Sequence, residues 1–252
     1  MKSIIQTINL TKKFGDFVAN NNISLDIKEG EIRCIVGENG AGKSTLMNML
    51  YGLVAPSSGK ILIRGEEVKM TNPLTAIGVG IGMVHQHFKL VSSLTVYENI
   101  LLGVEIKKKN SPLIDKKEEI KKVAKMIEDN HLQLNPTDKI EDISIGERQR
   151  VEILKMLYRN VDILILDEPT AVLTPKEVDD LIATLKLLKE QGKTIIVITH
   201  KLREVMELAD SITVLKHGNV VGDVLKQDTD EKEIARMMVG RDVCLIVQND
   251  RK

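Results

Sequence analysis

The sequence predicts an α/β fold with a mainly parallel sheet, and three observations lead to this prediction. Short runs rich in Ile, Leu and Val end at turn residues in "EIRCIVG", "VDILILDE" and "GKTIIVITH". Because these runs are apolar at consecutive positions, both faces of each strand are expected to be buried, as in a parallel sheet. Between the second and third runs lies an amphipathic helix pattern, and strands that alternate with helices are typical of parallel sheets with crossover connections.

The clearest helix pattern covers residues 174–191. Its apolar side chains recur on one face, namely Val178, Leu181, Ile182, Leu185 and Leu188. Thr174 and Glu177 have the spacing of a capping box, and Pro175 takes the first helical position. Gly192 follows the end, so the sequence predicts both termini of this helix.

Two other parts of the chain have different patterns. The first 30 residues and "GKILIRGEEVKM" show shorter strands with period-two alternation, which predict an antiparallel β flank. From about residue 88 to 150 the pattern is mostly helical and includes a helix capped by Asp115 and Glu118. We therefore expect one domain over residues 1–240 with an inserted helical subdomain, followed by a tail or linker over residues 241–252.

Composition limits the classes of partner. Lys and Arg number 36 and are balanced by 36 Asp and Glu, so no net charge draws the chain to nucleic acid. Acidic residues interleave with the lysines after residues 107–109, which favours a solvated surface there. The sequence has no apolar run of about 18 to 20 residues and no signal peptide pattern, which predicts a soluble cytosolic chain. Cys34 and Cys244 lack metal spacing, and we interpret both as packing residues.

The stretch "GENGAGKST" has the pattern of a phosphate-binding loop. It follows the apolar run at residues 32–36 and precedes a helical pattern, the context that such a loop requires. Glycines let the backbone N–H groups curl around a phosphate, Lys43 can reach its oxygens, and the Ser44 hydroxyl can hold Mg²⁺. The loop consists of Gly37, Glu38, Asn39, Gly40, Ala41, Gly42, Lys43, Ser44 and Thr45.

Polar side chains follow two further predicted strands. Asp167 ends a buried strand, where a carboxylate beside the phosphate loop can bind Mg²⁺ directly or through water. Glu168 points the other way along the pleat and can polarise an attacking water. His200 follows the next apolar strand, where it can donate a hydrogen bond to a terminal phosphate.

Two candidate residues are less specific. Gln86 ends the apolar stretch "GVGIGMV" at the junction with the helical insertion, where its amide can contact Mg²⁺ or water. The neighbouring His85 and His87 lack a third ligand for a metal site. Phe14 is one of three phenylalanines, and the residues alone leave core packing and stacking on an adenine ring equally open.

A second anion site is predicted about a hundred residues after the phosphate loop. In "ISIGERQRVEILKMLYRN", Ser144 and Gly146 lead into an amphipathic helix. The first turn of a helix has unpaired backbone N–H groups and the positive end of the helix dipole. Such an end attracts an anion, although the phosphate loop already provides one anion site.

Together these motifs resemble the ATP-binding subunits of ABC transporters over nearly the whole chain. In that family, the helix led by Ser144 and Gly146 is the signature motif, which grips the γ-phosphate of ATP held by a facing ATP-binding domain. The resemblance implies that ATP and Mg²⁺ bind, with residues 37–45 as the Walker A loop. It gives the remaining roles as follows: Phe14 stacks on adenine, Gln86 is the Q-loop residue, Asp167 is the Walker B aspartate, Glu168 is the catalytic glutamate and His200 is the switch histidine.

Two departures from the family pattern bear on the subgroup. The usual Leu-Ser-Gly-Gly-Gln signature reads "ISIGE", and the acid Glu147 is expected to weaken the grip on the γ-phosphate unless it points away. The loop after Walker B usually ends in aspartate, and here it ends in Thr174. With "YGL" and the stretch from residue 152 to 177, these departures resemble bacterial importers of nucleosides and simple sugars whose two ATP-binding halves share one polypeptide, and this chain would be the N-terminal half.

The resemblance implies an ATPase at the cytoplasmic face of the membrane, where dimer closure is coupled to transmembrane permease subunits and indirectly to an extracytoplasmic solute-binding protein. The facing ATP-binding domain would be a fused C-terminal half or a second copy.

One alternative is a soluble ABC ATPase of translation, DNA repair or cluster assembly. The sequence lacks the basic arms, coiled-coil insertion or long charged linker typical of those proteins. A second alternative, a regulatory half with weak hydrolysis, is kept open by the unusual signature and Thr174, while Glu168 and His200 favour one competent site.

Overall fold

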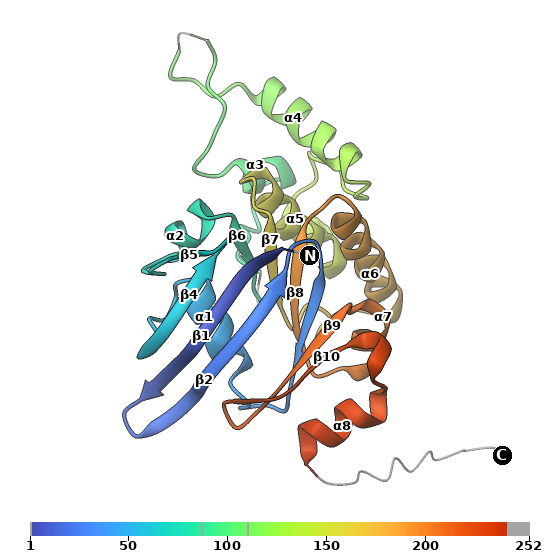
Figure 1. Ribbon diagram of the computed structural model, residues 1–252. Coiled ribbons are helices and arrows are strands. Elements are labelled where there is room, and N and C mark those ends of the chain that lie inside the picture. The colour runs from blue at the N-terminus through green and yellow to red at the C-terminus, as the bar shows by residue number, and fades with distance from the viewer. Residues whose placement is uncertain (1, 87, 110, 241–252) are drawn as a thin grey trace, which may run out of the picture.

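The computed structural model describes residues 2–86, 88–109 and 111–240 (Figure 1). The predicted tail over residues 241–252, including Cys244, lies outside the described residues, as does His87. Among the residues described, no helix combines the length and the hydrophobicity needed to cross a bilayer.

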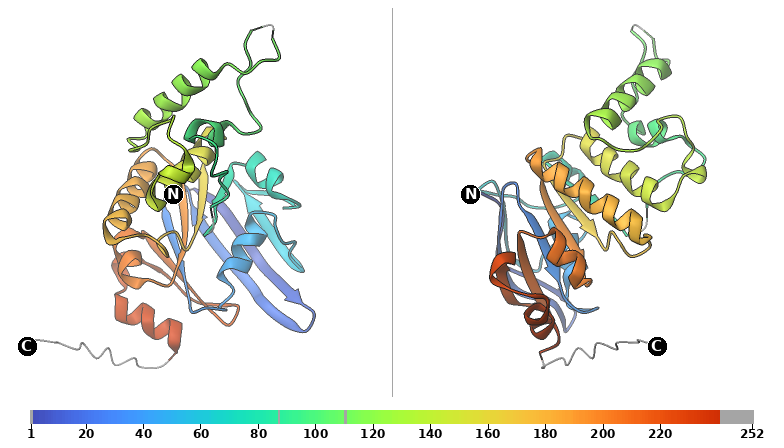
Figure 2. Two further views of the ribbon diagram at one scale, coloured as in Figure 1. Left: turned by 180° about the vertical axis from the view of Figure 1, so that it is seen from behind. Right: turned by 90° about the vertical axis from the view of Figure 1, so that its right-hand side faces the viewer.

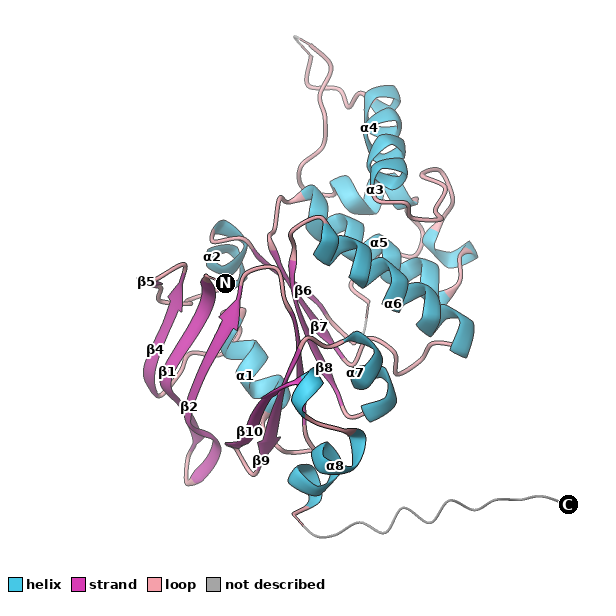
Figure 3. Ribbon diagram, turned by 45° about the vertical axis from the view of Figure 1, so that its right-hand side comes forward, coloured by secondary structure: helices cyan, strands magenta, loops and turns pink. Residues whose placement is uncertain are grey.

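The core is a sheet of six strands in the order β10-β9-β3-β8-β7-β6, drawn in magenta in Figure 3. Neighbouring strands from β9 to β6 are parallel, and β10 pairs antiparallel with β9 at one edge. The prediction of a mainly parallel sheet is therefore confirmed. The strands are β3 (Ile32–Val36), β6 (Ile81–Val84), β7 (Ile163–Asp167), β8 (Thr194–Thr199), β9 (Ser211–Lys216) and β10 (Asn219–Leu225).

The continuous apolar runs reflect burial on both faces of this sheet. In β7, Ile163 and Ile165 pack into one hydrophobic cluster, while Leu164 and Leu166 pack into a second. The second cluster also holds Cys34, where complete burial raises the pKa of the thiol to about 12 and supports its role as a packing residue. This cluster is covered by α5 (Ile145–Tyr158), α6 (Pro175–Glu190), α7 (Leu202–Leu208) and α8 (Glu231–Val239).

The predicted antiparallel flank is a separate sheet in the order β2-β1-β4-β5. Its strands are β1 (Ser3–Phe14), β2 (Phe17–Lys28), β4 (Ser58–Ile63) and β5 (Glu66–Glu67). The expectation of shorter strands is wrong for β1 and β2, which have 12 residues each. Register shifts in β1, for example between Thr7 and Leu10, interrupt the period-two alternation and so make one long strand look like several short ones.

Helix α1 (Lys43–Leu50) lies between the two sheets (Figures 1 and 3). Its buried residues Leu46 and Leu50 belong to the same cluster as Ile5 of the flank and Ile196 of the core. This packing fixes the first turn of α1, and hence the loop before it, relative to the core strands.

A helical lobe extends from one end of the core (Figure 2). It contains α3 (Val96–Leu101), α4 (Lys116–Asp129), a short 3₁₀ helix (Ile140–Asp142) and the beginning of α5, whereas α2 (Pro73–Gly78) packs against the core beside β6. The lobe has a hydrophobic cluster of its own that includes Val96, Ile100, Val123 and Leu154. As predicted, α4 is capped by Asp115, whose carboxylate accepts the Glu118 backbone N–H at 3.3 Å. The bounds 1–240 for the domain stay a prediction.

Candidate functional site

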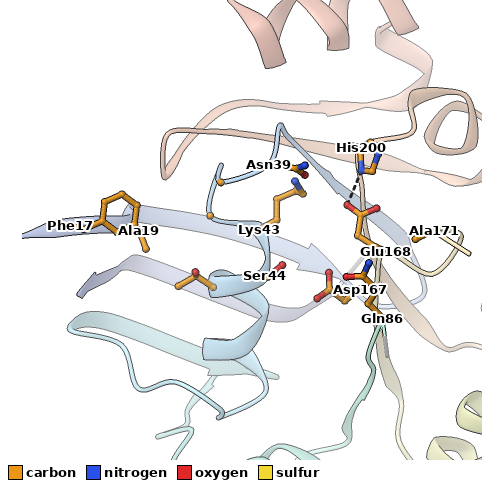
Figure 4. Close-up of a pocket in the computed structure, with 13 residues that line it drawn as sticks. Phe17, Ala19, Asn39, Lys43, Ser44, Gln86, Asp167, Glu168, Ala171 and His200 are labelled. Carbon is orange, nitrogen blue, oxygen red and sulfur yellow. Dashed lines mark hydrogen bonds and ion pairs between the residues drawn. The ribbon is translucent and has the colours of Figure 1, made fainter. Parts of the chain in front are cut away.

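An open cavity of about 480 Å³ lies where the loops after several core strands meet the β1–β2 hairpin (Figure 4). Its lining includes most of the predicted phosphate loop together with Asp167, which ends β7, and the two polar side chains Glu168 and His200, which follow β7 and β8. The lining residues are Phe17, Ala19, Asn39, Gly40, Gly42, Lys43, Ser44, Thr45, Gln86, Asp167, Glu168, Ala171 and His200. Gly37, Glu38 and Ala41 belong to the loop without lining the cavity.

Positive φ values favour glycine at two positions of the loop before α1. Gly40 and Gly42 have φ values of 82° and 100°, which side-chain-bearing residues rarely adopt. A Cβ atom on Gly42 would also lie 2.5 Å from the carbonyl oxygen of Ala19. The helix begins at Lys43, directly after Gly42, so the unpaired N–H groups of its first turn are available to a phosphate.

Lys43 supplies the cation of the cavity. Its Nζ donates hydrogen bonds to the carbonyl oxygens of Gly37 at 2.7 Å and Glu38 at 2.9 Å. The side chain is buried, and desolvation lowers its pKa, while Glu168 and Asp167 act in the opposite direction. A buried ammonium group held only by neutral carbonyl oxygens can gain a stronger, charge-assisted bond from a phosphate.

Asp167 and Glu168 bring carboxylate oxygens without hydrogen-bond partners to the opposite wall. Asp167 Oδ1 and Glu168 Oε2 are buried and have no hydrogen-bond partner among the described residues. Burial raises the pKa of Asp167, Glu168 raises it further, and Lys43 and the Ser44 hydroxyl lower it. The unpaired Asp167 oxygen beside the Ser44 hydroxyl provides oxygen donors of the kind that Mg²⁺ prefers, so Asp167 and Ser44 fit the predicted metal ion.

Glu168 and His200 contact each other directly. His200 Nδ1 lies 3.0 Å from Glu168 Oε1, an interaction drawn as a dashed line in Figure 4. Glu168 has a φ of 46°, an unfavourable conformation for a residue with a side chain. Its backbone N–H donates to the carbonyl oxygen of Ile198 at 2.9 Å, which holds this turn against β8. The histidine therefore holds one carboxylate oxygen and leaves the other for a ligand.

Gln86 is exposed at the cavity, and the segment after it is attached to α5. The Glu152 carboxylate of α5 accepts the Lys89 backbone N–H at 2.6 Å. Lys155 Nζ, also on α5, donates to the carbonyl oxygen of Lys89 at 3.3 Å. Movement of α5 would thus be transmitted to the segment that carries Gln86.

We expect Glu152→Gln to stabilise the protein at neutral pH. Burial raises the pKa of Glu152 above the ordinary value for glutamate. The free energy of unfolding therefore falls as the pH rises from that ordinary pKa through the raised one, because the unfolded chain loses the proton more readily. Glutamine keeps the acceptor for the Lys89 N–H without that charge. The expected result is a melting temperature about 2 °C higher at pH 7.5, with a smaller difference near pH 4. Thermal scans at both pH values, with the exposed Glu190→Gln as a control, would contradict this if the variant melted lower at pH 7.5.

The two phenylalanines of the β1–β2 hairpin occupy different positions. Phe14 pairs with Phe17 across the hairpin, but Phe17 lines the cavity and Phe14 is not among the lining residues. Phe14 is half exposed, and the Lys12 ammonium lies 5.0 Å from the centre of its ring. A ring suited to stack on a base is therefore available at Phe17 as well as at the predicted Phe14.

Ser144 and Gly146 lie outside the cavity, at the N-terminus of α5. Ser144 Oγ accepts the Glu147 N–H at 3.2 Å, and Glu147 Oε2 accepts the Ser144 N–H at 2.8 Å, which completes a capping box. Glu147 therefore folds back onto its own helix end. The Gly146 N–H donates to Glu177 Oε1 of α6 at 3.0 Å, so a carboxylate of this chain binds at the predicted anion site.

Comparison with known proteins supports the same interpretation of these motifs. The sequence model of the family described as "ABC transporter" matches residues 20–171, which is more than half of the chain. The chain belongs to the ABC transporter family. The resemblance drawn from the phosphate loop, Asp167, Glu168 and the helix at Ser144 is confirmed at this level.

Within this ABC transporter family, the chain is similar to import proteins of about twice its length. It is 50% identical over 247 residues to the nucleoside import ATP-binding protein NupA of Lactococcus lactis, covering 98% of this chain and 48% of that protein. It is 51% identical over 243 residues to the guanosine import ATP-binding protein NupO of Bacillus subtilis, with 96% and 47% covered. The chain thus spans about half the length of these relatives.

Solved ABC cassettes have the same fold. The ADP conformation of MJ1267, an ATP-binding cassette of an ABC transporter, superposes with a TM-score of 0.81 at 28% identity, covering 95% of this chain and 96% of that one. The dimeric structure of MJ0796, a bacterial ABC transporter cassette, gives a TM-score of 0.73 at 30% identity, with 88% and 99% covered. The predicted fold class is therefore confirmed.

The sequence interpretation missed four residues at these sites. Phe17, Ala19 and Ala171 line the cavity, and Glu177 bonds to Gly146. The pattern had given Glu177 a role only as a helix cap. The available signal for Phe17 was its position three residues after Phe14, with Gly15 and Asp16 between them, which leaves both rings at the same end of the flank.

Proposed function

We propose that this chain binds and hydrolyses ATP as the ATP-binding part of an ABC importer of nucleosides or simple sugars. The observation that carries the proposal is the cavity in which the buried Lys43 faces the unpaired oxygens of Asp167 and Glu168. The family match and the names of the two import relatives support ATP as the substrate and a nucleoside as the cargo.

The residues divide the chemistry of phosphoryl transfer among them. The backbone N–H groups of the loop and the Lys43 ammonium hold the phosphates, since this reaction depends mainly on position and charge neutralisation. Bound Mg²⁺, held by Ser44, Asp167 and Gln86, would neutralise negative charge that develops on the phosphates. Glu168 orients the attacking water with its free oxygen, and His200 holds the other oxygen and donates to the γ-phosphate in the closed state.

Closure requires a facing ATP-binding domain. Ser144 and Gly146 lie outside their own cavity, so the phosphate that they grip belongs to another domain. The dimeric MJ0796 cassette supports a pair of domains, and the double length of the relatives supports a fused C-terminal half over a second copy. The further partners are permease subunits, with a solute-binding protein acting indirectly, and the site of action is the cytoplasmic face of the membrane.

Sedimentation of the Glu168→Gln variant with and without Mg-ATP tests this function. If the chain can pair with a copy of itself, the expected result is an ATP-dependent dimer. If it cannot, we expect it to co-sediment with a separately expressed C-terminal half in the presence of Mg-ATP. A chain that binds ATP but associates with neither would contradict the proposal of paired domains. Single-turnover hydrolysis by the unmodified chain separates a competent site from the alternative of a regulatory half with weak hydrolysis.

We expect the ring of Phe17 to contribute to ATP affinity. Because it lines the cavity, Phe17→Ala should raise the Kd for ATP about three- to tenfold, as expected for the loss of one aromatic stacking contact. Phe14→Ala is the matched variant and should raise the Kd less, since its ring lies beside Lys12. Titration with a fluorescent ATP analogue measures both. A larger effect of Phe14→Ala than of Phe17→Ala would instead show that Phe14 stacks on the adenine, as the family pattern indicates.

A further inference from the structure

A carboxylate of α6 holds the end of α5 that is expected to bind the facing nucleotide. Glu177 Oε1 accepts the N–H of Gly146 at 3.0 Å, although 31 residues separate the two in sequence. Gly146 belongs to the helical lobe, whereas α6 packs on the core sheet. This hydrogen bond therefore joins the lobe to the core at the end of α5 that is proposed to face a second domain.

Thr174 places Glu177 in this position. Glu177 Oε2 accepts both the Thr174 backbone N–H at 3.0 Å and its hydroxyl at 2.8 Å, in the capping box of α6. The other oxygen, Oε1, is then free to accept the Gly146 N–H. An aspartate at position 174, as in the usual family pattern, would instead bring a second negative charge against Glu177 and has no hydroxyl to donate.

The contact is close because residue 146 is a glycine. A Cβ atom there would lie 2.8 Å from Glu177 Oε1 and 2.9 Å from its Cγ. Hydrogen bonds from Thr174 and Gly146 lower the pKa of Glu177, so the carboxylate is negatively charged at neutral pH. The Gly146 N–H thus has an anionic partner without any ligand.

We propose that Glu177 is an internal competitor of the γ-phosphate, which occupies the Gly146 N–H in the open state and must leave before the domain closes on the facing ATP. This inference rests on the proposed function of Ser144 and Gly146. Glu177 then raises the ATP concentration at which closure occurs, and it also ties the lobe to the core while the facing nucleotide is absent.

The physical basis is competition for one donor between two anions. The Gly146 N–H cannot make a full hydrogen bond to the carboxylate and to a phosphate at once. The carboxylate and the phosphate would also repel each other if both lay against this one donor. Bonds to an ionised acceptor are about twice as strong as those to a neutral one, so a neutral side chain at position 177 is a weaker competitor. Glu147 accepts the backbone N–H of Ser144, so it does not occupy the Gly146 N–H.

The test variant is Glu177→Gln, because glutamine can complete a capping box and therefore leaves α6 intact. Combined with Glu168→Gln to prevent hydrolysis, it should lower the Mg-ATP concentration for half-maximal association about tenfold in sedimentation velocity. Asp179→Asn is the matched control, since it removes one negative charge from the exposed side of the same helix and should leave the midpoint unchanged. The three proteins compared are Glu168→Gln alone, Glu168→Gln with Glu177→Gln, and Glu168→Gln with Asp179→Asn. Equal Mg-ATP midpoints of association for all three would overturn the proposal while leaving the proposed function intact.

If none of these proteins associates, identical chains do not pair under these conditions. A second measurement then tests whether Glu177 competes with phosphate for the Gly146 N–H. Inorganic phosphate is titrated into ¹⁵N-labelled monomer, and the Gly146 amide signal is followed by NMR. The signal in Glu177→Gln is expected to respond at about tenfold lower phosphate concentration than in the parent or in Asp179→Asn. An equal response in all proteins would mean that Glu177 does not compete, and the inference would be wrong.

Discussion

Replacement of Glu168 by glutamine is expected to lower ATP turnover at least about a hundredfold, while ATP binding survives. The carboxylate has one oxygen on His200 and one without a partner, so it can hold a water and accept its proton. Glutamine preserves the size and the contact to His200 but cannot accept that proton. Steady-state hydrolysis and the Kd for ATP, measured on the same preparation, check both parts of the prediction.

The control for this experiment is Glu190→Gln, which makes the same chemical change at an exposed position at the end of α6. Its turnover should equal that of the unmodified chain. Near-normal turnover of Glu168→Gln would remove Glu168 from the catalytic role, and lost ATP affinity in that variant would indicate a defect of the cavity as a whole.

Lys43→Ala is expected to weaken ATP binding itself, by about a hundredfold or more. The ammonium is buried at the start of α1 and bonded to two carbonyl oxygens of the loop, from which it can reach the phosphates. Loss of charge-assisted bonds to two phosphate oxygens costs about 3 kcal/mol or more, which corresponds to this change in Kd. Isothermal titration with ATP provides the measurement.

Lys186→Ala, an exposed lysine on α6, is the matched control and should bind ATP normally. A melting scan of both variants separates lost binding from lost folding, because removal of Lys43 also takes one hydrogen-bond donor from the carbonyls of Gly37 and Glu38, of which the Glu38 carbonyl keeps the Ala41 N–H. Affinity of Lys43→Ala within a few-fold of the unmodified chain would contradict the assignment of the phosphate loop.

The core sheet could be predicted from sequence because burial on both faces makes its strands apolar at every position, as in β7. The β9–β10 hairpin was not predicted, since no residue of β10 is fully buried and Gly222 and Asp223 weaken its strand pattern. A usable signal was the dipeptide His217-Gly218, and in the structure both residues adopt the positive φ expected in a two-residue hairpin turn. The length of β1 was hidden by its bulges.

The cavity was predictable to the extent that its residues end strands or follow them. Asp167, Glu168 and His200 occupy one edge of a parallel sheet, where the carboxyl ends of neighbouring strands meet. The role of Glu177 was not predictable, because the contact to Gly146 depends on how α6 on the core sits against the lobe. A local pattern identifies the cap but contains no information on where the second carboxylate oxygen points.

Helix α5 crosses from the lobe to the core, and this has a mechanical consequence. Val151 and Leu154 pack in the lobe, while Ile153 and Met156 pack against the core sheet. Ser144 lies nine residues before Ile153, or about 13 Å along a rigid helix. A tilt of about 5° at Ile153 would therefore shift Ser144 by about 1 Å, enough to make or break a hydrogen bond. The helix acts as a lever arm. Conservative substitutions of the side chains that pack it against the core should therefore alter closure, although these side chains contact neither nucleotide.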